Sequence, residues 1–328
     1  MEITQIKRKS IHPNSVDKIL DTINPLIASK INLKELTCPY QNNGVINKIK
    51  NLFWALTLKD KNIHITGDVT YLALFLFNKN IIITILDMGM FHRKKTLKNL
   101  FFNFLWYKIP IIKSKQIISI SDKTKNEIIN YYPFSKNKVK TIHVPLSRGY
   151  YYKKLNNNKL FKIIQVATSY HNKNVNRSIR ALDGLPVEYI LVGVISENDK
   201  KLLQNLKIKH RLYFNISEDL IIQLYEESDI LLFPSLYEGF GMPIIEAQAT
   251  SCCVITSNIQ PLIEVGGEGA IYVNPYNVDE ISKAISLLID SKKIFLQMIE
   301  KGYQNVKRFY PKKISIEYLK IYECLKEF

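Results

Sequence analysis

Short runs of β-branched and apolar residues alternate with amphipathic stretches along the whole chain, and this alternation limits the folds open to it. In the first half the runs are NIHIT (62–66), NIIITIL (80–86) and KQIISIS (115–121). Each ends in turn or cap residues, as strands do when helices cover both faces of a parallel sheet. Helical patterns accompany them, as in SVDKILDTINPLIAS (15–29) and SDKTKNEIINYY (121–132). The pattern predicts βαβ units.

The alternation begins again behind a polar, tyrosine-rich stretch, LSRGYYYKKLNNNK (146–159), which we interpret as a linker. One further helical pattern, NVDEISKAISLLID (277–290), starts with Asn277 and has Glu280 three residues on, which predicts a capping box. The remaining expected strands are 161–168, 187–194, 210–215, 229–235, 253–257 and 270–274, with helices at 174–182 and 217–228.

Two such series predict an α/β protein of two Rossmann-like domains, each with a doubly wound parallel sheet, that face a central cleft. We place the first domain at residues 1–155 and the second at 156–328. The last helix, about 306–328, is a candidate to pack back on the first domain. In doubly wound sheets the ligand binds at the carboxyl ends of the strands, so we expect the site in the cleft.

The net charge of +17 is unevenly distributed. Residues 1–158 hold 26 Lys and Arg against 9 Asp and Glu, whereas residues 159–328 hold 20 of each kind. This asymmetry favours a polyanionic partner for the first half, either nucleic acid or an anionic membrane surface. A general compositional drift toward Lys, Asn and Ile is the alternative, although it should affect both halves alike.

The four cysteines show no metal-ligand spacing, and we interpret them as reduced thiols of a cytosolic protein. The amino-terminal MEITQIKRKS lacks the apolar segment of a signal peptide. The longest apolar run, residues 99–112, is too short for a membrane-spanning helix and is interrupted by Lys108 and Pro110.

The stretch FPSLYEGFGMPIIEAQA (233–249) has the layout strand, loop, helix. We expect Gly239 and Gly241 to form a sharp turn with positive φ, and Pro243 to stand in the first turn of the helix. The backbone N–H groups of Phe240, Gly241 and Met242 then lie at a helix amino terminus, where amides bind phosphate or hydroxyl groups.

Two carboxylates flank this turn. Glu238 precedes it, and Glu246 lies about one helical turn beyond it with a side chain that leans back toward the helix start. Both can therefore reach one ligand. Because a carboxylate accepts hydrogen bonds from two vicinal hydroxyls, the pair favours a ligand with sugar rings. Two glutamates at this spacing also occur by chance on surface helices.

The element EGFGMPIIE resembles the E-x7-E motif of the retaining glycosyltransferases of family 4, which have the two-domain GT-B fold. PLIEVGGEGAIYVNPYNVDEI (261–281) and NKNVNRSIRAL (172–182) are similar to two further segments of that family. The first half is also similar. A strand and loop region of related sugar transferases resembles HITGDVTYL with TILDMGMF, and the end of the family's first domain resembles ISISDKTKNEI followed by NKVKTIHVPLSRGY. The resemblance covers roughly residues 60–290.

The resemblance implies a role for each matching residue. Glu246 would hold the ribose of a nucleotide sugar, and Glu238 would contact the donor sugar or its leaving group. Lys173 would neutralise the diphosphate as the glycosidic bond breaks. Asp87, after the strand IIITIL, would orient or deprotonate the acceptor hydroxyl. Donor binding would further involve the turn residues Gly239, Phe240, Gly241, Met242 and Pro243, together with Asn174.

Three departures from the family pattern stand out. Asn172 replaces the arginine that often precedes the lysine, so Arg177 is one candidate for a further diphosphate contact. The usual His-Asp pair reads Leu86-Asp87, and His92 is the alternative histidine, although its place next to RKK suggests the surface. No DxD-type metal site accompanies the proposed donor pocket, so we expect neither metal nor cofactor.

The resulting hypothesis is a peripheral enzyme on the inner face of the cell membrane. It would transfer a hexose from a nucleotide diphosphate sugar to a hydroxyl of a glycan. We expect a lipid-linked acceptor and an anionic membrane as its partners, and no nucleic acid. The segment FHRKKTLKNLFFNFLWYK (91–108) is the best candidate for membrane contact. The resemblance implies retention and synthesis of a bacterial-type surface polysaccharide such as O-antigen. Alternatives are an epimerase-like sugar-nucleotide enzyme and a non-catalytic protein that binds glycan or nucleic acid.

Overall fold

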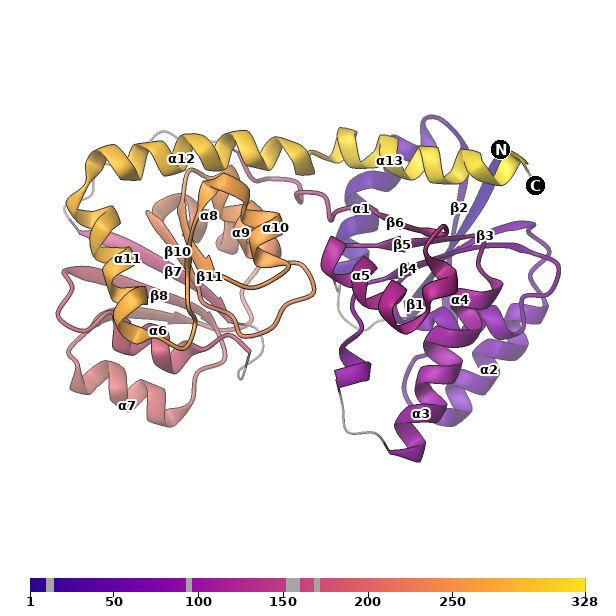
Figure 1. Cartoon of the computed structure of the whole chain (residues 1–328), viewed down its shortest axis with the longest axis horizontal. Helices are drawn as coiled ribbons and strands as arrows, with labels where there is room; N and C mark the ends of the chain where they lie inside the picture. The colour runs from indigo at the N-terminus through magenta and orange to yellow at the C-terminus, as the bar shows by residue number, and fades with distance from the viewer. Residues whose placement is uncertain (10–14, 93–95, 152–159, 168–171, 328) are drawn as a thin grey trace. The chain divides into compact units, whose positions relative to one another are not determined.

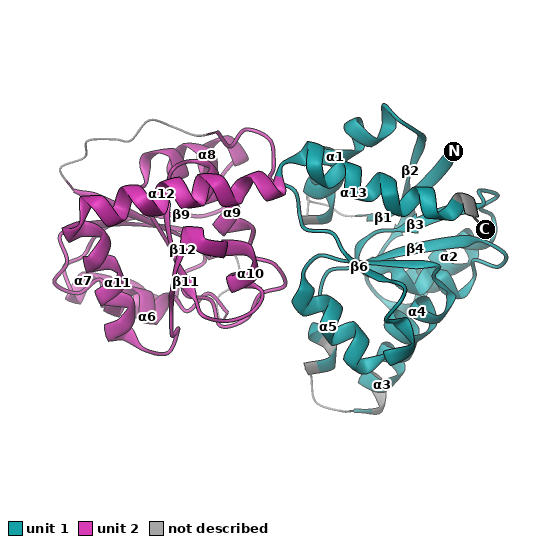
Figure 2. Ribbon diagram, turned by 45° about the horizontal axis from the view of Figure 1, so that its top comes forward, with its two compact units in different colours: residues 1–145, 310–328 teal, residues 146–309 magenta. Residues whose placement is uncertain are grey.

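The computed structural model describes residues 1–9, 15–92, 96–151, 160–167 and 172–327 (Figure 1). The chain divides into two compact units, shown in Figure 2: unit 1 is Met1–Pro145 with Tyr310–Phe328, and unit 2 is Leu146–Phe309. The boundary suggested by the sequence, between residues 155 and 156, lies outside the described residues. The carboxy-terminal helix α13 (Pro311–Glu323) is part of unit 1.

Unit 1 contains a parallel sheet in the order β2-β1-β3-β4-β5-β6. The three expected strands are present, but the sequence did not predict β1 and β2. Apolar residues in β1 are interrupted by Thr4 and Gln5, and β2 is a largely exposed edge strand, so neither shows a buried-strand pattern. The strands are β1 (Glu2–Lys9), β2 (Asn32–Gln41), β3 (Asn62–Ile65), β4 (Asn80–Ile85), β5 (Gln116–Ser119) and β6 (Val139–Thr141).

Helices cover both faces of this sheet. Along β1, Ile3 and Gln5 point to the face under α1 and α13, while Ile6 packs in the core cluster that contains Ala55 of α2. Buried His64 joins the sheet to α13, since its ring nitrogens lie 2.8 Å from the hydroxyls of Tyr322 and Thr84. The helices are α1 (Ser15–Ala28), α2 (Val45–Leu56), η1 (Gly67–Leu74), η2 (Gly89–His92), α3 (Leu97–Asn103), the π-helical η3 (Phe104–Lys108), α4 (Ile109–Lys113), α5 (Asp122–Tyr131), η4 (Pro133–Ser135) and η7 (Cys324–Glu327).

Unit 2 contains the second parallel sheet, in the order β12-β11-β10-β7-β8-β9. All six strands expected after residue 160 are present within two residues of their predicted ends. The strands are β7 (Phe161–Ala167), β8 (Val187–Gly193), β9 (Lys209–Tyr213), β10 (Ile230–Phe233), β11 (Cys253–Ser257) and β12 (Ala270–Val273). The helices are α6 (Val175–Ala181), α7 (Glu197–Asn205), α8 (Glu218–Glu227), α9 (Met242–Ala249), α10 (Leu262–Gly266), η5 (Gly267–Gly269), α11 (Val278–Asp290), α12 (Lys292–Val306) and η6 (Lys307–Phe309).

The cap predicted for α11 forms only in part. The Asn277 side chain accepts a hydrogen bond from the Glu280 N–H at 3.1 Å, as expected. Glu280, however, accepts from the N–H of Asn274 rather than from that of Asn277, so it closes the loop after β12 instead of a capping box. Ser121 before α5 and Ser217 before α8 each accept a hydrogen bond from the backbone N–H three residues on.

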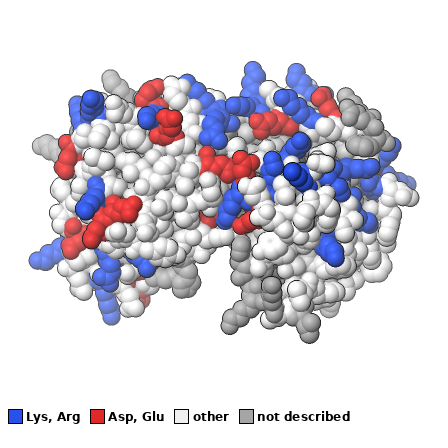
Figure 3. All heavy atoms as spheres, in the orientation of Figure 1, with Lys and Arg blue, Asp and Glu red and all other residues white. Residues whose placement is uncertain are grey.

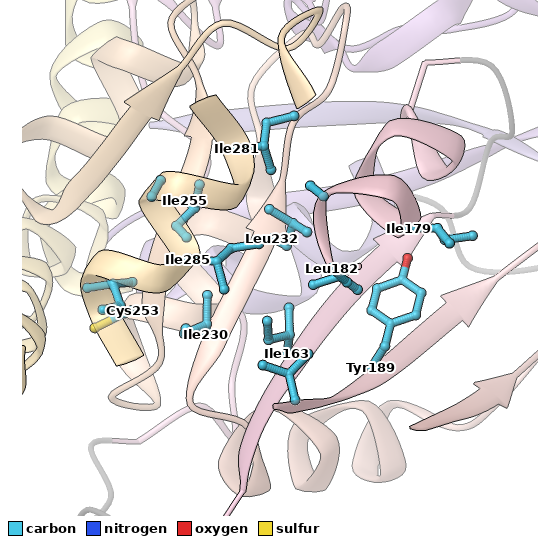
Figure 4. Packing of buried hydrophobic residues seen from close by; sticks show 14 of the residues in the cluster. Ile163, Ile179, Leu182, Tyr189, Ile230, Leu232, Cys253, Ile255, Ile281 and Ile285 are labelled. Carbon is cyan, nitrogen blue, oxygen red and sulfur yellow. The ribbon is translucent and has the colours of Figure 1, made fainter. Parts of the chain in front are cut away.

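The core of unit 2 lies between its sheet and the helices α6, α11 and α12. Figure 4 shows Ile163, Ile230 and Leu232 of the sheet packed with Ile281 and Ile285 of α11. This packing holds the strands β7 and β10 side by side and fixes where their carboxyl ends lie. Within the described part of the chain, no helix is both long and apolar enough to cross a membrane.

Candidate active site

The loop between β10 and α9 carries the residues that the sequence singled out. Gly241 caps α9 with φ +108°, a conformation that favours glycine. A Cβ at this position would also lie only 2.7 Å from Leu262 Cδ2, so both the backbone conformation and the available space favour glycine. Pro243 stands in the first turn of α9, as predicted. Gly239 does not adopt a positive φ, so that part of the prediction is wrong; the turn is made at Gly241 alone.

Lys173 and Glu238 meet at the carboxyl ends of the neighbouring strands β7 and β10. Lys173 Nζ lies 2.5 Å from Glu238 Oε1 and 4.5 Å from the centre of the Phe233 ring, the last residue of β10. Both side chains are largely removed from solvent, with exposed fractions of 10% and 15%. A cation and a carboxylate are thus held together in a weakly hydrated place, where each strongly affects any charged ligand.

Buried hydrogen bonds fix the backbone that carries Lys173. The carbonyl of Lys173 accepts from Gln165 Nε2 at 2.6 Å, and Gln165 in turn accepts from the Tyr189 hydroxyl at 2.6 Å. The carbonyl of Asn172 accepts from the N–H of Leu236 at 2.8 Å and so ties this loop to the β10–α9 loop. The ammonium group is therefore preorganised by the sheet rather than carried on an independent loop.

Asn174 holds three loops together. It adopts a left-handed conformation, with φ 58°, at the start of α6. Its side-chain amide donates to the carbonyls of Pro234 at 3.1 Å and Pro275 at 2.6 Å, and its Oδ1 accepts from Arg177 at 2.9 Å. Because both amide hydrogens are used within the protein, the geometry gives this side chain a positioning role. Arg177 also stacks 5.2 Å over the ring of Tyr276.

Glu246 lies buried on α9, where Tyr225 of α8 donates a hydrogen bond to its Oε2 at 3.1 Å. The ring of Tyr150 packs edge-on against Tyr225, 5.9 Å between centroids. Burial raises the pKa of both hydroxyls well above their usual range, and the negative charge of Glu246 raises them further. Both tyrosines therefore stay protonated, and Tyr225 acts as a fixed donor that orients the Glu246 carboxylate.

Sequence reasoning missed Tyr225 as part of the site. It expected the helix 217–228 but assigned no role to its tyrosine. The sequence did hold a signal, because Tyr225 follows the apolar Leu224 within the expected helix. Both are buried in the structure, and a buried tyrosine hydroxyl needs a polar partner. The partner itself, twenty-one residues further along the chain, is visible only in the fold.

Phe240 differs from the other turn residues because its side chain belongs to the core. It is buried, and its ring packs edge-on against Phe309 at 5.8 Å. The side chain therefore anchors the turn, and what Phe240 can offer a ligand is its backbone. Met242 and Pro243 beside it are partly exposed.

Asp87 lies in unit 1, just after β4. Its Oδ1 accepts from the N–H of Gly89 at 2.8 Å, and its carbonyl accepts from the Tyr107 hydroxyl at 3.3 Å. It lines a pocket of about 340 Å³ whose wall combines carboxylates, amide and hydroxyl groups with aromatic rings. The lining residues are Asn42, Lys48, Gly67, Asp68, Thr70, Thr84, Ile85, Leu86, Asp87, Phe102, Trp106 and Tyr107.

The structure thus brings Lys173, Glu238 and Asn174 together around the carboxyl ends of β7 and β10, and fixes Glu246 on α9 behind the same loop. Asp87 belongs to a separate pocket in unit 1. The side chain of His92, the alternative histidine, lies outside the described residues.

Two parallel, doubly wound units with polar residues at their strand ends define a GT-B fold. The glycosyltransferase of Rickettsia africae superposes with a TM-score of 0.78 at 18% identity, covering 98% of this chain and 97% of that one. Anabaena Alr3699/HepE, solved with UDP and glucose, superposes with a TM-score of 0.75 at 15% identity over the full length of both chains. At these identities the likeness shows the fold.

Residues 151–305, which lie in unit 2, match the family Glycosyl transferases group 1. The O-antigen chain mannosyltransferase RfbU of Salmonella typhimurium is 27% identical over 226 residues, 63% of each chain. N,N'-diacetylbacillosaminyl-diphospho-undecaprenol alpha-1,3-N-acetylgalactosaminyltransferase of Campylobacter jejuni is 25% identical over 178 residues, 53% of this chain and 47% of the relative. The chain thus spans between about half and two thirds of the length of these relatives.

Proposed function

We propose that the protein is a retaining glycosyltransferase that moves a hexose from a nucleotide diphosphate sugar to a hydroxyl group of a glycan. The observation that carries the proposal is the Lys173–Glu238 pair, held 2.5 Å apart at the carboxyl ends of β7 and β10 within the matched domain. A diphosphate leaving group gains negative charge as the bond to the sugar breaks. A preorganised ammonium group in a weakly hydrated site stabilises that charge.

In this proposal the bond between the anomeric carbon and the diphosphate oxygen breaks, and the acceptor oxygen forms the new bond on the same side. Lys173 exchanges Glu238 for the diphosphate, and the released Glu238 carboxylate accepts hydrogen bonds from the donor sugar. Glu246, oriented by Tyr225, accepts from the ribose hydroxyls. The acceptor hydroxyl gives its proton to a carboxylate, for which Asp87 is our candidate. Lys173 supplies the positive charge, so we propose that the reaction needs neither metal nor cofactor.

For the acceptor we propose a lipid-linked glycan of a bacterial-type surface polysaccharide. Two named relatives support this choice, one an O-antigen chain mannosyltransferase and one named for a diphospho-undecaprenol substrate. The concentration of Lys and Arg in residues 1–158 fits a protein that works at an anionic surface. We accordingly place the protein at the inner face of the cell membrane, as a peripheral protein.

The test is a set of incubations of the purified chain with UDP- and GDP-sugars and lipid-linked acceptors, followed by mass spectrometry and by NMR of the new anomeric centre. Lys173→Met should lower the rate of transfer by about 10²–10³. Lys162→Met is the matched control. Lys162 lies at the start of β7 and belongs to another Lys–Glu pair of unit 2, with its Nζ 3.0 Å from Glu227 Oε2. Transfer should persist in EDTA.

The proposal fails if no sugar nucleotide gives transfer, nucleotide release or a thermal shift. A sugar nucleotide of altered configuration without any transfer would instead indicate an epimerase. An inverted anomeric centre would refute retention alone and would leave the transferase assignment standing.

A further inference from the structure

The outward side of α2 is apolar, which is unusual for a helix on the surface of a soluble unit. Asn51 and Ala55 turn inward and are buried. Val45, Ile46, Ile49, Phe53 and Leu56 are between 45% and 71% exposed. At 3.6 residues per turn these five side chains lie within an arc of about 100°, opposite the buried side. A helix that packs on its own sheet normally presents charged residues there.

Aromatic contacts extend this apolar surface beyond α2. Phe53 packs edge-on against Phe75 at 5.9 Å, and Phe75 stacks on Phe77 at 6.5 Å. On the other side, Lys48 of α2 lies over the rings of Phe102 and Trp106, at 5.8 and 5.3 Å. Leu100, Phe101 and Phe104, beside those rings, are also exposed. We call the whole surface the lipid face: α2, Phe75, Phe77 and residues 100–106.

Lysines surround the lipid face. Lys50 lies over Tyr40 at 5.2 Å, Lys108 over Phe104 at 5.7 Å and Lys113 over Phe77 at 4.4 Å. Within the described residues, none of these three, nor Lys48, forms an ion pair. Figure 3 shows more blue than red over the visible surface of unit 1. Lys113 also donates to the carbonyls of Ala73 and Leu74, whereas Lys50 and Lys108 are exposed. Exposed lysines beside apolar rings suit a boundary between hydrocarbon and anionic headgroups.

We propose that the lipid face inserts into the headgroup layer of an anionic phospholipid bilayer. An amphipathic surface helix with exposed apolar residues and a rim of lysines binds such a layer lying in its plane. A second copy of the chain fits less well, because a symmetric contact would bring lysines of the same sign opposite one another. The exposed apolar residues also lie together on one side of α2, whereas apolar residues on a soluble surface are normally scattered.

The position of the lipid face explains how a membrane-bound acceptor would reach the protein. Lys48, Phe102 and Trp106 belong both to the lipid face and to the wall of the Asp87 pocket. A headgroup that emerges from the bilayer therefore meets this pocket without leaving the surface. The membrane contact deepens the peripheral location proposed above, and this second step rests on the proposed function.

The experiment is vesicle binding by the full chain, with phosphatidylcholine vesicles and with vesicles one third of whose lipid is phosphatidylglycerol. Both tryptophans of the chain, Trp54 on α2 and Trp106 in η3, lie on the elements that form the lipid face. Their emission should shift to the blue on anionic vesicles, and brominated lipid should quench it. Binding should weaken as the salt concentration rises.

Two pairs of variants test the surface separately. Ile46→Gln with Ile49→Gln should reduce binding at least tenfold, and Lys50→Gln with Lys108→Gln should reduce it about fivefold for each lysine. Ile316→Gln is the matched control: Ile316 is 46% exposed, against 45% for Ile49, and lies on α13 over the opposite side of the sheet. Circular dichroism checks that each variant is folded.

The inference is overturned if the chain ignores anionic vesicles, or if folded variants of either pair bind like the unmodified chain. It is also overturned if light scattering shows a dimer that Ile46→Gln with Ile49→Gln dissociates, because a second copy then covers the surface. Hydrolysis of the donor sugar in the absence of vesicles is measured on the same samples. Loss of vesicle binding with intact hydrolysis, or the reverse, separates failure of this inference from failure of the proposed function.

Discussion

Replacing Lys173 with methionine separates the two things that this residue does. Methionine has a similar length and no charge, so it fills the space over Phe233 and leaves Glu238 without its cation. Removing the cation beside a carboxylate with only 15% exposure costs several kcal/mol, and we take about 3 kcal/mol as the loss of stability. For a unit of this size that lowers the melting temperature by roughly 6–12 °C.

The double variant Lys173→Met with Glu238→Gln removes both charges and should recover most of that loss, because a neutral amide is much cheaper to bury than a carboxylate. Turnover should not recover. Loss of one preorganised charged group typically lowers kcat by about 10²–10³. The double variant should therefore regain stability without regaining turnover. This result indicates that Lys173 acts on the substrate.

Differential scanning calorimetry and a donor-turnover assay on the single and double variants make the comparison, with Lys162→Met beside them. Lys162 and Glu227 are 23% and 31% exposed, so that control should cost no more than about 1 kcal/mol and leave turnover unchanged. The reasoning is refuted if the double variant regains activity together with stability, since Lys173 then serves only the fold. It is equally refuted if Lys173→Met melts like the unmodified chain.

Three further predictions concern the elements around the site and the core of unit 1. Gly241→Ala should destabilise unit 2 by about 2–3 kcal/mol in calorimetry, whereas Gly184→Ala, at φ +72° with open space around it, should show the backbone strain of about 1 kcal/mol without the clash. Tyr225→Phe should raise KM for the donor more than it lowers kcat, because it removes the donor that orients Glu246; an unchanged KM would contradict this. Burial lowers the pKa of His64 from 6.5 to about 3, so the unfolded chain takes up the proton first, and unit 1 should lose about 1.6 kcal/mol of stability between pH 6.5 and pH 5. His64→Gln should flatten that slope in urea titrations at the two pH values, and an equal slope in both proteins would assign the effect to other groups.

The strands and helices of unit 2 could be predicted from sequence because their signals are local. A buried parallel strand such as Ile230–Phe233 is apolar throughout, and helices that start at Ser217 or Asn277 carry their caps beside them. The sharp turn before α9 could likewise be predicted from adjacent residues. The prediction gave a positive φ to both Gly239 and Gly241, whereas only Gly241 of the two adopts one. The chemistry proposed for Glu238 and Lys173 also came from the sequence, through motif and resemblance.

What the sequence did not predict depends on partners far apart in the chain. The contact of Lys173 with Glu238 and that of Glu246 with Tyr225 exist only because the sheet places β10 beside β7 and α8 packs against β7. Asn174 has a local sequence typical of a helix start, yet its amide is used by two carbonyls from other loops. Hydrogen-bond partners of this kind are set by strand order, which composition and periodicity leave open.

The sequence by itself determined the alternation of strand and helix, and with it two parallel sheets whose strand ends carry the polar residues. Whether an apolar helix face turns inward or outward was decided only in the tertiary structure. The apolar residues of α2 have the spacing of any buried helix face, and Ile46 and Ile49 alone give no sign of exposure. Asn51 and Ala55 take the inward side because Asn51 bonds to the backbone of Tyr40 in the edge strand β2. That contact turns the apolar side of the helix toward solvent.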